Sequence, residues 1–323
     1  SQVDEKVDLN DVLALMQQAG VRHTILSARG KRKGSDLVAV ASRHASQITP
    51  AVRSKGAPFA EGSPKYFRML DAQVASGKYG AMAEVLLYHA KKGNKAPEYR
   101  LLPREKAVVA ALQHAKRQNW PFVIHIEFAA LPGTDRRVFM QAMNELLKKY
   151  PHMNFVLTHM GQLGPEEVSR LINEHDNLYF HTAWTNPAAI GRSSQPWVNL
   201  FEGERFAPPW RELMAAHPER FVFALDNVFT EHWQPDFYRE QVRLWKKALA
   251  DLPANGRGVT RQLVGQSVSL FARELVESHD AAVGPPHAPR VDMRTVRWTP
   301  ADHRDKQLAF HEGRAADAKK ILH

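Results

Sequence analysis

Three strand-like runs in this chain each end in a side chain that can bind a metal ion. The runs are FVIHIEF (122–128), FVLTHMG (155–161) and FVFALDN (221–227), and they carry His125, His159 and Asp226. Each begins with aromatic and β-branched residues, as buried parallel strands do, and then changes to a polar residue that a hydrophobic core does not require. Barrel enzymes keep their chemistry at the carboxyl ends of such strands, so three such changes in chain order predict a site.

Strand-like and helical segments alternate along the chain. The sequence predicts strands over 21–27, 47–53, 80–88, 121–128, 154–161, 177–184 and 220–227, and helices over 8–20, 64–77, 103–119, 138–151, 166–175, 210–218, 235–250 and 259–276. This order predicts a parallel sheet covered by helices. A closed (β/α)8 barrel has eight strands. Because seven are found and a helix comes first, we expect an α/β TIM-like barrel that lacks its first strand.

Composition and charge narrow the class of protein. The chain has 323 residues, of which 44% are hydrophobic, enough for a full core. Its formal charge of +10 comes from scattered residues, which favours plain surface solvation over nucleic-acid binding. Only RGKRKG (29–34) is a dense basic cluster, and it is either a solvated loop or a contact for a ligand's phosphate or carboxylate. We therefore expect a small-molecule substrate and no nucleic acid.

The absence of cysteine excludes disulfides, thiolate nucleophiles and zinc-finger sites. It fits a cytoplasmic or a periplasmic protein, so the compartment stays open. No apolar run approaches the ~20 residues of a membrane span, and no signal peptide opens the chain, so no membrane association is expected. The evenly charged surface offers no distinct interface, and a homodimer is a hypothesis only.

The composition changes after about residue 277, where PPHAP and scattered charges begin. We expect a barrel domain over 1–276 and a C-terminal extension over 277–323, made of a linker and a helix at 315–322. One hypothesis places this tail across the open seam where the first strand would lie, because unpaired strand edges are a liability.

The order of the motifs resembles the amidohydrolase superfamily, specifically the amidohydrolase-2 group of metal-dependent TIM-barrel hydrolases and decarboxylases. The resemblance covers residues 9 to about 272 and rests on AGVRHTILS, the glutamate of GAMAEV, HIEF, THMG, the aspartate of ALDN and LVGQSVSLF. It implies one or two divalent ions, with Zn²⁺ expected, and a water activated by the metal at the carboxyl end of the barrel. Single motifs are short, and their order is more specific than any one of them.

The resemblance also implies roles for individual residues. His125 corresponds to the metal histidine of the fifth strand. His159 corresponds to the sixth-strand histidine, which binds a second ion or positions substrate or water. Asp226 corresponds to the eighth-strand aspartate, which contacts the metal and takes a proton from the attacking water. Glu84 falls on the fourth strand, where some members place a bridging carboxylate.

One departure from the family pattern affects the metal site. The first strand of the family ends in a His-x-His pair, and no His-x-His occurs in these 323 residues. The chain begins where that strand would have just ended, so the upstream residues were removed, excluded by a wrong start, or lost naturally. The sequence as given supplies three ligands for one divalent ion.

Each candidate residue also has a structural alternative. His125 and His159 can be hydrogen-bonded core residues, Asp226 can cap a helix, and Glu84 can be explained by an ion pair with an arginine such as Arg53. Three more residues at strand ends are candidates for substrate binding. They are Arg53 as an anion clamp, His181, which can equally be ordinary packing, and Trp184 as a wall.

Two functions follow from these observations. The first is a metal-dependent hydrolase, or a non-oxidative decarboxylase, acting on a small anionic carbonyl compound. In it a neutral imidazole pair and a carboxylate hold the ion, and Asp226 serves as general base. The alternative is a non-catalytic TIM-barrel binding protein with an incomplete metal site.

Overall fold

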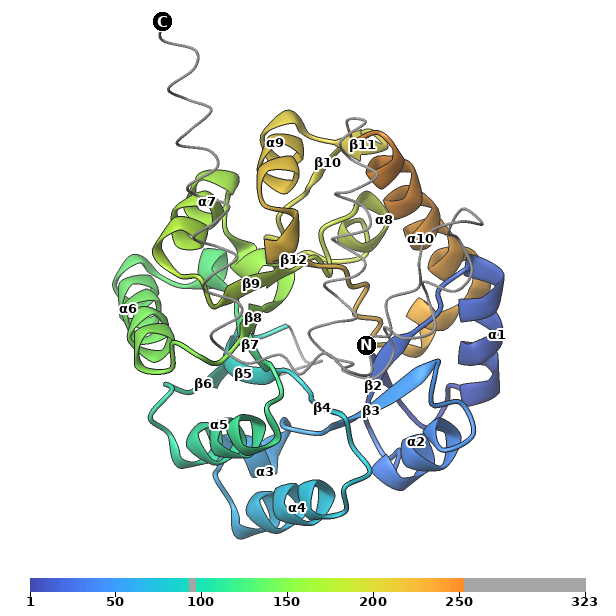
Figure 1. Cartoon of the computed structure of the whole chain (residues 1–323), viewed down its shortest axis with the longest axis vertical. Helices are drawn as coiled ribbons and strands as arrows, with labels where there is room; N and C mark the ends of the chain where they lie inside the picture. Colours follow the sequence, from blue (N-terminus) through green and yellow to red (C-terminus); the bar gives the residue numbers. More distant parts are fainter. Residues whose placement is uncertain (93–96, 253–323) are drawn as a thin grey trace, which may run out of the picture. The chain divides into compact units, whose positions relative to one another are not determined.

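Parallel strands form the inner layer of the protein, and helices surround them (Figure 1). The computed structural model describes residues 1–92 and 97–252. One sheet has the order β1 (Gln2–Val3), β2 (Thr24–Ala28), β3 (Ile48–Val52), β4 (Ala81–Met82). The other has the order β12 (Phe221–Val222), β9 (Leu178–His181), β8 (Phe155–Leu157), β7 (Phe122–Ile126), β5 (Val85–His89), β6 (Tyr99–Arg100). All pairs in the two sheets are parallel except β5 with β6.

The two sheets meet at both edges. β4 and β5 follow each other along the chain and are separated by Ala83 and Glu84, and the Ala83 N–H donates to the carbonyl of Val52 in β3 at 2.9 Å. At the other edge, the Gln2 N–H of β1 donates to the carbonyl of Asn227, beyond β12, at 2.7 Å. With β4 and β5 counted as one interrupted strand, eight strand positions encircle the core, and the predicted TIM-like α/β barrel is confirmed.

The first strand differs from the expectation. β1 pairs in parallel with β2, with Gln2 opposite Ser27 and Val3 opposite Ala28. Two residues are too few to show any alternation of polar and apolar side chains, so the sequence gives no sign of this strand. The described residues therefore include two that occupy the first strand position, which the sequence was expected to lack.

The outer layer consists of helices whose ends follow local sequence signals. Asp8 caps the first helix by accepting from the Asn10 N–H at 2.8 Å, and Gly20 ends it in the left-handed conformation at φ 70°. The α-helices are α1 (Leu9–Ala19), α2 (Gly34–Ala41), α3 (Ala57–Ala60), α4 (Pro64–Ala75), α5 (Lys106–Gln118), α6 (Gly133–Lys149), α7 (Pro165–Glu174), α8 (Pro187–Ile190), α9 (Pro208–Ala216) and α10 (Pro235–Ala250). Short 3₁₀ helices are η1 (Phe128–Ala130), η2 (Thr158–Gln162), η3 (Pro218–Arg220) and η4 (Thr230–Trp233).

The structure adds several short elements that the sequence does not predict. Helix α2 begins at Gly34, the last residue of the basic cluster, and β6 pairs with β5. The segment 186–209, for which the sequence predicts neither helix nor strand, contains α8 and the hairpin β10 (Phe201–Glu202) to β11 (Arg205–Phe206). The predicted helices at 259–276 and 315–322, and the C-terminal extension at 277–323, lie outside the described residues.

Apolar packing at the beginning of the strands leaves their carboxyl ends for polar groups. Phe122, Phe155, Phe180 and Phe221 lie in four strands that neighbour one another, and all four are fully buried. Rings of neighbouring strands touch, with Phe122 and Phe155 edge to face at 6.1 Å between centroids. No helix within residues 1–92 and 97–252 is both long and apolar enough to span a membrane.

Candidate metal centre

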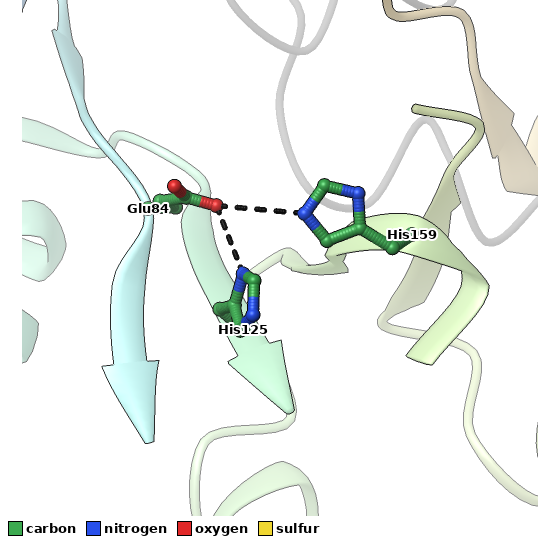
Figure 2. A group of neighbouring side chains, drawn as sticks. All are labelled: Glu84, His125 and His159. Carbon is green, nitrogen blue, oxygen red and sulfur yellow. Dashed lines mark hydrogen bonds and ion pairs between the residues drawn. The ribbon is translucent and has the colours of Figure 1, made fainter. Parts of the chain in front are cut away.

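Polar side chains from neighbouring strand positions converge inside the barrel. Glu84 lies at the break between β4 and β5, His125 is in β7, and His159 follows β8. Figure 2 shows the three side chains pointing toward one another. His125 Nδ1 lies 3.1 Å from Glu84 Oε2, and His159 Nε2 lies 3.9 Å from the same oxygen. One ligand atom from each of the three residues lies within 4.8 Å of the others.

Asp226 approaches the same His159 nitrogen that faces Glu84. Its Oδ2 is 3.7 Å from His159 Nε2, and its side chain is buried. Asp226 is not within the 4.8 Å set of the other three. Asp226 therefore contacts His159 but is not one of the three residues that could hold the ion.

The hydrogen bonds of both histidines set their ring nitrogens for metal binding. His159 Nδ1 is 3.2 Å from the carbonyl of Ala183, which can only accept, so Nδ1 carries the proton and Nε2 presents its lone pair toward Glu84 and Asp226. His125 Nε2 is 3.0 Å from Glu127 Oε1, and its Nδ1 faces Glu84. Metal-bound histidines typically donate their second N–H to a carbonyl or a carboxylate in this way. Two imidazoles and one carboxylate are also the donors that Zn²⁺ and similar ions take, so the residues fit such an ion.

The charges around the centre are compensated in pairs. Burial alone would oppose ionisation of Glu84, but the contact with the Lys55 ammonium and the hydrogen bond from His125 outweigh it and hold the pKa of Glu84 well below its usual range. Burial also opposes protonation of His125, yet its hydrogen bonds to Glu127 and Glu84 raise its pKa. Burial and the neighbouring His125 lower the pKa of His159 to about 4. His159 is therefore neutral near pH 7, and His125 must release a proton from Nδ1 to bind an ion.

Glu127 and Lys92 also belong to the centre, although neither is among the residues predicted from the sequence. Glu127 is fully buried, and it accepts from the Ala90 N–H at 2.8 Å, from Lys92 Nζ at 2.7 Å and from His125. Burial would favour the neutral acid, but the bonds to His125 and Lys92 lower the pKa of Glu127 and keep it ionised. Its signal is visible in the motif HIEF, because residues two apart in a strand lie on the same face.

The backbone leaves β8 through an uncommon turn. His159, Met160, Gly161 and Gln162 have φ values of 55°, 55°, 62° and 57°, and Asp226 has φ 50°. Residues other than glycine seldom adopt this left-handed region, and strained backbone tends to occur at functional sites. The sharp turn that follows the strand places His159 toward the centre.

Replacing Gly161 with alanine should lower the free energy of unfolding by about 2–5 kcal/mol. The left-handed backbone costs about 1–2 kcal/mol for a residue with a Cβ, and overpacking adds about 1–3 kcal/mol. The added Cβ would lie 2.6 Å from Leu157 Cδ2 and 3.3 Å from Phe128 Cδ2. Urea unfolding measures the effect. Gly133→Ala is the matched control, because nothing lies within 4 Å of its added Cβ. Equal stability of the two variants would contradict this account.

The remaining candidate residues lie around the centre. The His181 ring in β9 lies 6.3 Å from that of His159, and its Nδ1 is buried without a hydrogen-bond partner within the described chain. The Trp184 indole N–H donates to the Asp226 carbonyl at 3.2 Å. Trp197 lies in the segment between α8 and β10, and its ring centroid is 4.9 Å from that of His159 and 5.7 Å from that of Trp184. The two tryptophans thus form an aromatic wall beside His159.

Arg53 does not pair with Glu84. Its Nη1 donates to the Gly30 carbonyl at 3.2 Å, at the ends of β3 and β2. The cation that accounts for Glu84 is Lys55, two residues further along. The predicted ion pair of Glu84 is therefore formed with a lysine, not with an arginine. Arg53 stays a candidate for substrate binding.

Comparison with known proteins places the chain in a family. The model of the amidohydrolase family matches residues 63–257, which is more than half of the chain. The chain belongs to the amidohydrolase family. Members of this superfamily usually bind divalent metal ions, and in this amidohydrolase the matched region contains Glu84, His125, His159 and Asp226. No curated protein matches the chain.

Solved structures share the fold of this amidohydrolase at low sequence identity. An uncharacterized TIM-barrel protein from Bordetella bronchiseptica is 13% identical with a TM-score of 0.52, over 83% of this chain and 84% of the other. A putative 2-pyrone-4,6-dicarboxylic acid hydrolase from Pseudomonas putida is 15% identical with a TM-score of 0.52, over 83% and 89%. An Agrobacterium tumefaciens protein is 18% identical with a TM-score of 0.50, over 81% and 84%. These likenesses establish the barrel fold alone.

Proposed function

We propose that this amidohydrolase is a metal-dependent hydrolase that acts on a small anionic carbonyl compound such as an ester, a lactone or an amide. Non-oxidative decarboxylation of a carboxylic acid is the related reaction at the same centre. One observation carries the proposal. Glu84 Oε2, His125 Nδ1 and His159 Nε2 face one point, and the second nitrogen of each histidine is held by another group.

The residues supply distinct parts of the chemistry. A bound Zn²⁺ or similar ion would lower the pKa of water to about 7 and polarise the substrate carbonyl. Asp226 accepts the proton of the attacking water and passes it to the leaving group, which is the task of a general base. The hydrogen bond from the Trp184 indole to its carbonyl holds the Asp226 backbone in place. His159 stays neutral near pH 7 because its pKa lies at about 4.

The distribution of charge supports an anionic substrate. Lys55 and Lys92 are already paired with Glu84 and Glu127. Arg53 has no carboxylate partner within residues 1–92 and 97–252, and one hydrogen bond to Gly30 leaves other guanidinium N–H groups available. A guanidinium fork matches a carboxylate in two parallel hydrogen bonds, so Arg53 is the proposed anion clamp. Trp184 and Trp197 offer the aromatic surface for the organic part of the substrate, and His181 lies beside His159.

The alternative is a barrel that binds a ligand without turnover. No His-x-His pair occurs in the 323 residues given, and the alternative is kept for that reason. The two proposals differ in one measurable property, which is turnover that depends on added metal.

Metal-dependent turnover tests the proposal directly. Protein stripped with a chelator is reconstituted with Zn²⁺ or Mn²⁺ and assayed by proton release on a panel of lactones and esters, each with and without a carboxylate. We expect turnover that requires metal and a higher kcat/KM for the carboxylate member of each pair. Metal binding without turnover of any compound would favour the non-catalytic binding protein. Equal kcat/KM values for the compounds with and without a carboxylate would contradict the preference for an anionic substrate.

A further inference from the structure

His125 belongs to two groups of side chains that could each hold an ion. The first group is Glu84, His125 and His159, and the second is His89, His125 and Glu127. Within each group the ligand atoms lie within 4.8 Å of one another. The two groups lie on opposite edges of one imidazole, since Nδ1 faces Glu84 and Nε2 faces Glu127.

A single imidazole cannot serve both groups in its ordinary form. A neutral imidazole has one nitrogen with a free lone pair, and the other nitrogen carries a proton. An ion bound at Nδ1 therefore leaves an N–H at Nε2, and that N–H needs an acceptor. Glu127 Oε1, at 3.0 Å, is such an acceptor. Only one of the two groups can therefore bind an ion through His125. The other group accepts the remaining N–H of His125 and so orients its ring.

The carboxylate contacts decide which group binds. Both oxygens of Glu127 already accept hydrogen bonds, Oε2 from the Ala90 N–H and Oε1 from Lys92 and His125. Lys92 is held from its other side as well, since its Nζ lies 4.8 Å above the Trp197 ring. An ion between His89 and Glu127 would have to displace the ion pair of Lys92 with the buried Glu127, and leaving a buried carboxylate without its partner is costly.

Glu84 divides its two oxygens differently. Oε1 accepts from Lys55 Nζ and, at 3.1 Å, from the Gln2 amide. Oε2 faces only the histidines, at 3.1 Å from His125 Nδ1 and 3.9 Å from His159 Nε2. Once Nδ1 has lost its proton, Oε2 is open to an ion, whereas Oε1 is held by an ammonium group. A second ion bridged by this carboxylate would have to replace Lys55.

We infer that the centre takes one divalent ion, at Glu84, His125 and His159, and that Lys55 is a built-in cation in the place of a second ion. The same reasoning makes Glu127, fixed by Lys92, a positioning residue that holds the His125 ring and its Nε2 proton. This inference rests on the proposed function, because it requires that the protein bind a divalent ion at all.

Metal stoichiometry and affinity test the inference on the full chain. Chelator-stripped protein is loaded with Zn²⁺, freed of excess ion and measured by elemental analysis, and affinities come from competition with a chromophoric chelator. We expect one equivalent in the wild type. His159→Gln should weaken Zn²⁺ binding by at least about 100-fold, because even the loss of an orienting partner costs about 10- to 100-fold. His89→Gln, the matched histidine of the other group, should change it by less than about 3-fold.

Lys55→Met tests the built-in cation. Removing an ammonium next to the ion removes a repulsion, so Zn²⁺ should bind about tenfold tighter or more. Weaker binding would overturn the role of Lys55. Thermal unfolding of each metal-free variant verifies that it is folded.

The outcomes separate this inference from the proposed function. Two equivalents in the wild type, or loss of the ion in His89→Gln with retention in His159→Gln, would overturn the inference and leave a metal-dependent hydrolase standing. No bound ion in the folded wild type would overturn the proposed function and the inference together.

Discussion

Replacing Asp226 with asparagine is expected to lower kcat by about 10²- to 10⁴-fold, the range that a general base contributes, while the protein keeps its metal ion. The amide has the shape of the carboxylate but does not accept a proton near neutral pH. Metal is retained because the donors of Glu84, His125 and His159 form a set that does not include Asp226. Asparagine is the right replacement, since Asp226 has φ 50° and asparagine tolerates this region while alanine would add backbone strain.

The measurement pairs steady-state kinetics with elemental analysis of the same preparation. Asp176→Asn is the matched control, because Asp176 is exposed in the turn before β9 and should leave both values unchanged. If Asp226→Asn loses its metal together with its activity, Asp226 is a ligand rather than the base. If kcat does not change, the proton is taken by another group and the role of Asp226 is wrong.

The strand ends of this chain could be predicted because their signal is local. A buried strand that changes from apolar residues to histidine or aspartate is visible in the letters alone, and parallel strands bring such ends together. Glu84, His125 and His159 do converge, and Asp226 adjoins them. The barrel follows from the same alternation of strands and helices.

The partners of these residues could not be predicted, because they depend on contacts between distant segments. Lys55 reaches Glu84 across 29 residues, and Lys92 reaches Glu127 across 35. The Trp197 ring packs on His159 from a polar loop with no regular pattern. Glu127 is the exception, since its spacing of two residues from His125 in the strand-like motif HIEF predicts that both side chains point the same way. Which nitrogen of each histidine faces the candidate metal site can be seen only in the structure.

Acid should destabilise the metal-free protein well above the range in which its carboxylates titrate. Burial lowers the pKa of His89 and His181 to about 3, and that of His159 and His232 to about 4. For His232 the hydrogen bonds agree, since its Nδ1 accepts from the Val228 and Phe229 N–H groups and has no free lone pair for a proton. The unfolded chain, with histidine pKa values near 6.5, takes up protons first as the pH falls.

The sign and size of the effect follow from this difference. A group whose pKa is lower in the folded state contributes stability that is complete above about pH 6.5 and is lost as the pH falls toward the folded value. At pH 5.5 each such histidine accounts for about 1.4 kcal/mol. His125 acts in the opposite sense, because its pKa is raised. We expect the free energy of unfolding to fall by about 3–5 kcal/mol between pH 7.5 and 5.5, a large share of the 5–15 kcal/mol typical of a protein.

Urea unfolding of chelator-treated protein at the two pH values measures this loss. His181→Gln should reduce this loss of stability by about 1.4 kcal/mol, because the variant lacks one histidine whose pKa differs between the folded and unfolded states. His152→Gln removes an exposed histidine and should leave it unchanged. A stability that stays constant from pH 7.5 to 5.5 would mean that these rings already gain protons in the folded protein. His159 would then carry a charge at the centre that competes with a metal ion, so the same titration also tests whether the centre is neutral enough to bind one.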